Sequence, residues 1–272
     1  MSDRVFIDGH AHWHDTLGPA AFLDAARRNF RRAGGVSASG EALQGVLCLA
    51  DFSGAEGWSR LSAFGDDAVI GAWQLRGGDQ QAMLATHQGG DRLWLVAGRQ
   101  AVTAEKLEVM ALGTARPILA GLPLEETLRL VRDLGALPVL PWGAGKWWGR
   151  RGRLVEGALG AQAPPLLGDN GGRPWCWRPL LLSRARRHGG AVLPGSDPLP
   201  VASDRQRNGS YGLVMKGASR IGRLPRMAAG AGRPIGGVGN FSVARWASPP
   251  LLPVSWRCAE KEGPCELPDR TG

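Results

Sequence analysis

The feature that most constrains the fold of this chain is a regular alternation of short apolar runs with amphipathic segments over residues 1–203. Amphipathic helical patterns cover 19–32, 123–135 and 178–190. Alternating strands and helices predict an α/β fold with a parallel sheet, and eight runs favour a closed or distorted TIM-like (β/α)7-8 barrel over an open sheet. The apolar runs, which suit buried parallel strands, are VFI (5–7), GVLCLA (45–50), AVIGAW (68–73), LWLVAG (93–98), LEVMALG (107–113), LPVLPW (137–142), PPLLG (164–168) and GAVLPG (190–195).

Polar side chains follow most of these runs, at the point where each predicted strand ends. In α/β barrels the chemistry collects at the carboxyl ends of the strands. Repeated polar groups at those ends are therefore what a ring-shaped site requires. In chain order they are Asp8, His10, His12 and His14, then Asp51, Gln74, Gln100, Trp142, Lys146, Asp169, Asn170 and Asp197.

The segment IDGHAHWH contains three of the five histidines of the chain. Side chains two apart on an extended segment point to the same side, so His10 and His12 can face one ligand. Two imidazoles in this arrangement are a ready chelate for a divalent metal ion. The alternative is a polar barrel mouth that carries surface histidines.

Two aspartates are the candidates for catalytic groups. Asp197, in PGSD at the end of the last predicted strand, could complete the metal shell or hold an attacking water as a base. Its alternative is a turn before Pro198. Asp51 follows the second run, and turn formation or helix capping competes with a catalytic role there.

The segment GAGKWWGRRGR (143–153) places basic side chains on a glycine-rich loop after the sixth run. Lys146, Arg150 and Arg151 would suit a phosphate, a sulfate or a nucleic-acid backbone. The segment is not a Walker A loop, because Trp147 stands where Ser or Thr must bind magnesium. A solvated basic loop is the alternative. Asn170 is a further substrate-binding candidate, against a helix-capping role.

Charge is distributed unevenly along the chain. The formal net charge is +9. Residues 204–272 hold 11 basic and 5 acidic side chains, a net charge of +6, whereas residues 1–203 carry only +3. The final quarter is also rich in Gly and Pro. We expect a barrel domain over 1–202 and a mostly irregular basic tail over 203–272, with nucleic acid a weakly supported partner.

The sequence carries no sign of export or of a membrane partner. No run approaches the roughly 20 apolar residues that span a bilayer, and MSDRVFIDGH lacks the apolar region of a signal peptide. The four cysteines have no zinc or redox spacing, so free thiols in a reducing cytoplasm are expected. The sequence does not indicate the oligomeric state.

The chain resembles the PHP (polymerase and histidinol phosphatase) metallo-phosphoesterases. Their opening Asp-x-His-x-His is similar to Asp8-Gly9-His10-Ala11-His12, and their final Gly-Ser-Asp-Ala-His looks like the segment 195–199. Weaker matches to the middle motifs lie at 50–52 and 98–108, so that the resemblance runs over 3–200 in the right order. It implies a distorted barrel with a cluster of up to three metal ions that hydrolyses phosphoesters.

The chain departs from the family pattern at several ligand positions. Phe52, Glu108 and Leu199 replace ligand histidines, Gln100 replaces a bridging glutamate, and the His-Pro expected after the sixth run reads Pro141-Trp142. The groups that remain are His10, His12 and Asp197, which can hold one zinc, manganese or iron ion with open positions.

Three functions therefore compete. The first is a PHP-like metal-dependent hydrolase of a small phosphorylated substrate, and the second is a catalytically degenerate binding or regulatory protein with the same fold. The third is an amidohydrolase-type barrel with Lys146 as a modified bridging lysine. It ranks last, because no further histidines follow the middle strands.

Overall fold

A computed structural model describes residues 4–14, 17–37, 40–52, 56–77, 81–173, 177, 179–187, 192–216 and 243–247. Over these residues the protein is a mixed α/β fold built on one 12-stranded sheet. In chain order the elements are β1 (Arg4–Ala11), α1 (Pro19–Gly34), β2 (Gln44–Asp51), α2 (Gly57–Ser62), β3 (Val69–Ile70), β4 (Trp73–Gly77), β5 (Ala82–His87), β6 (Arg92–Val102), β7 (Glu108–Leu112), α3 (Leu124–Asp133), β8 (Leu137–Pro141), α4 (Gly149–Leu159), β9 (Leu166–Asn170), α5 (Leu180–Arg187), β10 (Val192–Gly195), the 3-10 helix η1 (Ala202–Asp204), β11 (Tyr211–Lys216) and β12 (Val243–Ala247).

Eight of the twelve described strands run in one direction, namely β1, β2, β4, β6, β8, β9, β10 and β12. The main strand order is β10-β9-β8-β7-β6-β2-β1-β11-β12, and β3, β4 and β5 extend it from β6. The pairs β1–β2, β2–β6, β8–β9 and β9–β10 are parallel, and β7 is antiparallel to both β6 and β8. Strands β1, β2, β6, β8, β9 and β10 therefore end at the same edge of the sheet.

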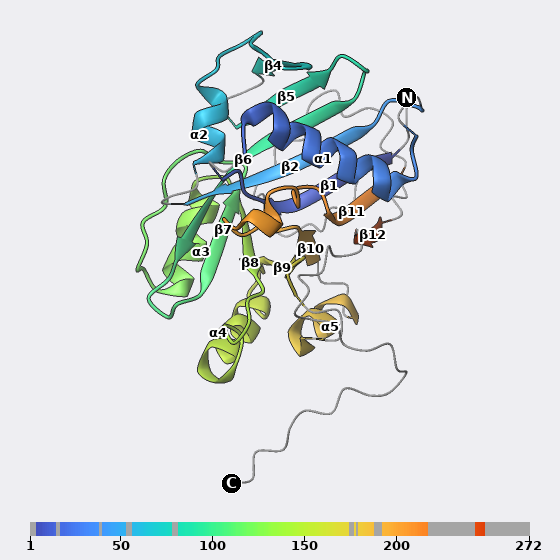
Figure 1. Cartoon of the computed structure of the whole chain (residues 1–272). Helices are drawn as coiled ribbons and strands as arrows, with labels where there is room; N and C mark the ends of the chain where they lie inside the picture. The colour runs from blue at the N-terminus through green and yellow to red at the C-terminus, as the bar shows by residue number, and fades with distance from the viewer. Residues whose placement is uncertain are drawn as a thin grey trace, which may run out of the picture.

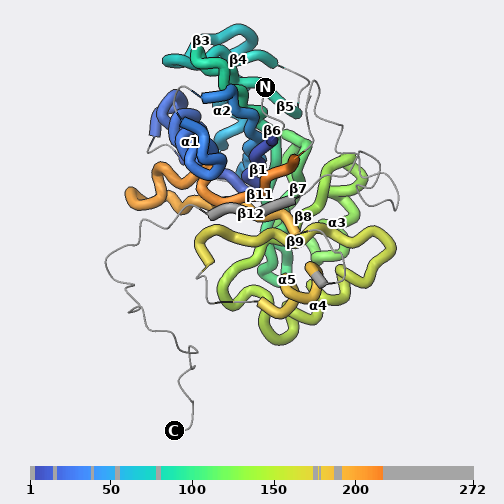
Figure 2. Tube along the Cα trace, turned by 90° about the vertical axis from the view of Figure 1, so that its right-hand side faces the viewer, coloured from blue at the N-terminus to red at the C-terminus, as the bar shows by residue number. Residues whose placement is uncertain are grey.

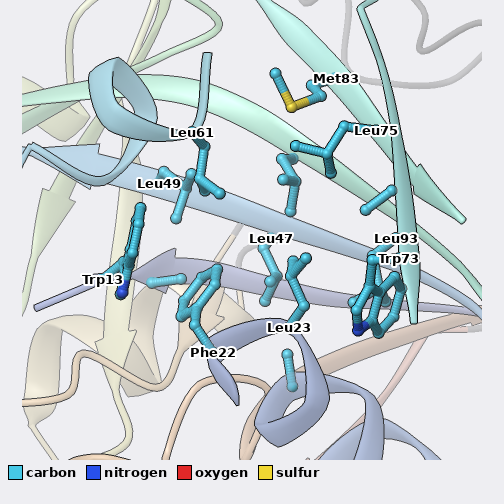
Figure 3. Packing of buried hydrophobic residues seen from close by; sticks show 14 of the residues in the cluster. Trp13, Phe22, Leu23, Leu47, Leu49, Leu61, Trp73, Leu75, Met83 and Leu93 are labelled. Atoms are coloured by element: carbon cyan, nitrogen blue, oxygen red, sulfur yellow. The ribbon is translucent and has the colours of Figure 1, made fainter. Parts of the chain in front are cut away.

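Helix α1 covers the β1–β2 part of the sheet (Figure 1). Pro19 at its first turn and Gly35 after its last, in the left-handed conformation at φ 62°, set its limits. Its apolar face, which includes Phe22 and Leu23, packs against strand residues such as Leu47 (Figure 3). Helices α3, α4 and α5 lie at the other end of the sheet, beside β7, β8 and β9 (Figures 1 and 2).

The central strand β2 is covered on both of its faces. Every residue of β2 is buried. Leu47 and Leu49 belong to the core under α1, whereas Val46 and Cys48 point to a second cluster shared with Val139 of β8. That second cluster joins strands from β1 to β8, so the sheet curls around it.

The predicted parallel, closed barrel is not formed by strand pairing in the described residues. Only five residues, 103–107, connect the paired ends of β6 and β7, with Lys106 at φ 63°, and this hairpin forces an antiparallel pair. The run 68–73 likewise becomes part of an antiparallel β3–β4–β5 extension, in which Gln74 is exposed far from the common strand edge. The free side of β1 pairs with β11, so the sheet stays open in its pairing.

Part of the segment expected to be an irregular tail belongs to the sheet. Strand β11 pairs antiparallel with β1, and β12 pairs with β11. Residues 217–242 and 248–272 of that segment lie outside the described residues. Within the described ranges, none of the helices combines the length and apolar character that crossing a membrane requires.

Candidate metal centre

The sheet brings the side chains of His10, His12 and Asp197 together. One ligand-type atom from each lies within 4.8 Å of the others. Nε2 of His10 and Nε2 of His12 lie 3.5 and 3.3 Å from Oδ1 of Asp197. Both imidazoles are buried, while the Asp197 side chain is 20% exposed. The group is therefore open to solvent on the carboxylate side.

The site depends on a close approach between the ends of β1 and β10. The backbone N–H of Asp197 donates a hydrogen bond of 2.7 Å to the carbonyl of His10. Gly195 makes this contact possible, because a Cβ at that position would lie 2.2 Å from the backbone nitrogen of His10. The ends of β1 and β10, which are 185 residues apart at His10 and Gly195, therefore lie in direct contact although the two strands do not pair.

The buried side chain of Asp8, two residues before His10, links the ends of β1 and β10 by hydrogen bonds. Its buried carboxylate accepts hydrogen bonds from the Ser196 hydroxyl (2.6 Å) and from the backbone N–H groups of Ser196 (2.8 Å), Gly209 (2.7 Å) and His10 (3.1 Å). Burial raises the pKa of Asp8 to about 6, and the hydrogen bonds oppose that rise. Asp8 therefore fixes the backbone positions of His10 and Ser196 and is not itself one of the three ligand candidates.

The electrostatics of His10 and Asp197 favour the protonation states that bind metal. Burial lowers the pKa of His10 to about 4, against the opposing effect of Asp197. Burial by itself raises the pKa of Asp197, but His10 and His12 beside it bring that pKa below its ordinary value. At neutral pH the site offers a neutral His10 imidazole and a carboxylate. Two nitrogens and one oxygen of this kind fit zinc, manganese or iron.

Two of the predicted substrate-binding residues lie beside this group. The Asn170 amide at the end of β9 donates a hydrogen bond to Asp197 Oδ2. Lys146 forms an ion pair with Glu108, and its charge lowers the pKa of both His10 and Asp197.

Other predicted residues are engaged elsewhere. The Asp51 carboxylate accepts hydrogen bonds from the backbone N–H groups of Trp58 (3.0 Å) and Ser59 (3.3 Å), at the start of α2. Arg151 donates a hydrogen bond to the carbonyl of Gly145 at 2.8 Å, and Arg150 is exposed on α4. Among the described contacts, neither arginine touches the three ligand candidates, so their role in substrate binding stays a prediction.

Three further residues lie at the site, of which the strand-end pattern includes Gln100 but neither Phe52 nor Ser196. Gln100 Oε1 accepts a hydrogen bond from His10 Nε2 at 3.1 Å. The Phe52 and His12 rings contact each other edge to face, with their centroids 5.2 Å apart. Ser196 holds Asp8, as described above. The Gly-Ser-Asp segment is the only signal for Ser196, and it indicates a turn rather than a buried hydrogen bond.

The comparisons with known proteins found distant structural similarity and no sequence relative. No family model and no curated protein matches the chain. One similar structure is PsfC from Pseudomonas syringae PB-5123, with a TM-score of 0.49, 14% identity and coverage of 79% of this chain and 83% of PsfC. A second is the lesion-specific endonuclease PfuEndoQ from Pyrococcus furiosus, with a TM-score of 0.48 and 12% identity.

A third similar structure is Endonuclease Q in complex with a 27-mer duplex that carries an abasic lesion, with a TM-score of 0.46 and 12% identity. The two endonuclease matches each cover 78% of this chain. They cover 52% and 53% of the endonuclease chains, so this chain spans about half the length of those proteins.

Proposed function

We propose that this protein is a PHP-like metal-dependent hydrolase of phosphoesters with a reduced metal site. The observation that carries the proposal is the group formed by the buried His10 and His12 with the partly exposed Asp197, at the carboxyl ends of β1 and β10. These three side chains would hold a single divalent ion. When bound, such an ion supplies Lewis-acid activation of water and of a phosphoryl oxygen.

The surrounding residues have separate roles in this proposal. Asp197 is the exposed member of the group, so its carboxylate can also accept a proton from an incoming water. Asn170 orients that carboxylate through its hydrogen bond. Lys146, currently paired with Glu108, offers a positive charge for a substrate phosphate oxygen.

A second candidate is a binding or regulatory protein that holds an ion without turnover. The hydrogen bond between Gln100 and His10 favours it, because Gln100 competes with an ion for the His10 Nε2 atom. The ring of Phe52 beside His12 also occupies space that a second ion would need.

Metal content separates these candidates from a metal-free protein. We expect purified protein to carry close to one equivalent of zinc, manganese or iron by elemental analysis, and the His10→Ala plus His12→Ala double variant to carry almost none. A wild-type protein that contains no metal and gives no calorimetric signal with Zn²⁺, Mn²⁺ or Fe²⁺ would refute the proposal.

Turnover then separates the hydrolase from the binding protein. The test panel contains p-nitrophenyl phosphate, bis-p-nitrophenyl phosphate and an abasic DNA duplex, each assayed with the metal-loaded protein. We expect Asp197→Asn to lower the hydrolysis of at least one substrate by about 100-fold or more. A metal-loaded wild type with no activity on any of the three supports the binding protein instead.

A further inference from the structure

His12 and Asn208 each present a buried polar atom that no neighbouring group satisfies. Among the described residues, Nδ1 of His12 and Oδ1 of Asn208 are the two buried side-chain atoms without a hydrogen-bond partner. Both residues line the same small cavity, together with His14, Asp204 and Trp13. An unsatisfied buried polar atom costs about 1–3 kcal/mol, so two such atoms at one cavity call for a shared partner.

The size and lining of the cavity fit one water molecule. Its volume is about 10 Å³, close to what a single water requires. A water can accept a hydrogen bond from His12 Nδ1–H and donate one to Asn208 Oδ1. The Asp204 carboxylate, which lines the same cavity, can accept the second water proton. Three polar partners are typical of a buried water.

The orientation of His12 makes this water relevant to the metal centre. The His12 Nε2 atom faces Asp197 at 3.3 Å, so Nδ1 is the ring nitrogen that remains for the cavity. A neutral imidazole carries its proton on one nitrogen only. The Asp197 carboxylate favours the proton on Nε2 in the metal-free protein, whereas a hydrogen bond donated by Nδ1 to the water favours Nε2 as the lone pair that an ion needs. Outer partners of this kind fix the tautomer of a metal-binding histidine.

The Asn208 segment is held firmly enough to serve this purpose. The Asn29 side chain on α1 donates hydrogen bonds to the carbonyls of Gln206 (2.6 Å) and Asn208 (2.8 Å). The N–H of Gly209 donates a hydrogen bond to Asp8, which also holds the β1–β10 junction. The position of Asn208 is therefore set by the same groups that build the metal centre.

We propose that a buried water joins His12 Nδ1 to Asn208 Oδ1, and that Asn208 is thereby a positioning residue that keeps His12 Nε2 free to bind a divalent ion. The role of Asn208 in metal binding rests on the proposed function. The effect of Asn208 on the His12 tautomer can be measured in metal-free protein and does not depend on that function.

The test uses Asn208→Leu, which removes the acceptor, and Asn208→Asp, which keeps one. We expect Asn208→Leu to weaken Zn²⁺ binding by about 10- to 100-fold in calorimetry and Asn208→Asp to retain affinity within about 3-fold. Gln206→Ala, whose side chain makes an exposed contact with Arg28, is the matched control in the same loop and should leave the affinity unchanged. If Asn208→Leu does not fold, the smaller apolar variant Asn208→Val replaces it.

The second readout is the ¹⁵N chemical shift of the His12 ring in metal-free protein at about pH 8.5, well above the ordinary imidazole pKa. We expect a larger fraction of the Nδ1–H tautomer in the wild type than in Asn208→Leu, because in the variant the water no longer opposes the preference of Asp197 for the proton on Nε2. An unchanged tautomer in the apolar variant overturns the inference. If the wild type binds no metal but the tautomer follows Asn208, the proposed function fails while this inference stands.

Discussion

Asp197 occupies a backbone conformation that restricts which residues can replace it. Its φ is 42°, in the left-handed region that Asn, Asp and Gly tolerate and other side chains avoid. We predict that Asp197→Ala is less stable than Asp197→Asn by about 1 kcal/mol, because Asn shares the tolerance for this conformation. Urea unfolding of both metal-free variants measures the difference, and equal midpoints would contradict it.

Position 195 also restricts which residues it can hold, because there is no space beside it for a side chain. A Cβ at this position would lie 2.2 Å from the His10 backbone nitrogen and 2.4 Å from its Cβ. We predict that Gly195→Ala lowers Zn²⁺ affinity at least 10-fold and destabilises the protein by about 1–3 kcal/mol, because the β1–β10 junction must open. Calorimetry and urea unfolding measure the two effects.

Gly157 supplies the matched control for that substitution. It lies in α4, and a Cβ there would meet no atom within 4 Å. Gly157→Ala should leave metal binding unchanged and add up to about 1 kcal/mol of stability through helix propensity. If both alanine variants bind Zn²⁺ as the wild type does, the close approach at Gly195 does not build the site.

At the scale of elements, Asp91 ties α1 to the sheet. Its carboxylate is fully buried. It accepts hydrogen bonds from Nε and Nη2 of Arg31, both at 2.7 Å, from the Arg27 side chain, and from the backbone N–H of Leu43 at 2.8 Å. We predict that Asp91→Asn destabilises the protein by about 3 kcal/mol at pH 7, because it leaves buried arginine charge without its partner. Urea unfolding checks this value, with the exposed Asp67→Asn as a control that should change stability by less than about 0.5 kcal/mol.

The contribution of Asp91 also depends on pH. Burial raises the pKa of Asp91, but the hydrogen bonds from Arg31 and Leu43 outweigh burial and place that pKa below its ordinary value. The stabilisation is therefore complete above the unfolded-state pKa, near 4, and is lost as pH falls through the folded-state pKa. The gap in unfolding free energy between wild type and Asp91→Asn should narrow below about pH 4. A gap that stays constant down to pH 2.5 would contradict this assignment.

Local pattern predicted elements better than it predicted their pairing. The helices expected at 19–32 and 123–135 become α1 and α3 with nearly the same limits, because a strong apolar face and a clear end signal agree. The basic segment 143–153 was expected to be a loop, yet its second half starts α4. Its glycines lower helix propensity, and the helix is favoured by the packing of Val155 in the core, with Leu154 and Leu159 against the same cluster.

The residues of the candidate site also fall into those that local pattern predicts and those that depend on the pairing of distant strands. His10, His12 and Asp197 follow from period-two geometry and from strand ends, and the structure places them together. Asn208 could not be predicted, because nothing in an Asn-Gly turn indicates that it faces a cavity beside His12. Such a contact depends on the β1–β11 pairing, which is a property of the complete sheet.

At the scale of the whole molecule, the excess of positive charge is separate from the ligand candidates. The candidate metal centre consists of two histidines and one aspartate, and the nearby Lys146 is paired with Glu108. Most of the net charge of +9 comes from residues 204–272. Electrostatic affinity for nucleic acid and turnover of a small phosphoester should therefore respond to different substitutions.

We predict that replacing four tail arginines by Gln separates these two properties. The change at Arg220, Arg223, Arg226 and Arg233 lowers the formal net charge from +9 to +5. The salt dependence of binding to undamaged duplex DNA should weaken by a slope of up to about 4, since each phosphate contact contributes about 0.9. Metal content and hydrolysis of bis-p-nitrophenyl phosphate should stay at wild-type levels. Fluorescence anisotropy at several salt concentrations, run beside the hydrolysis assay, makes the comparison. Loss of small-substrate hydrolysis in this variant would contradict the predicted separation of the two properties.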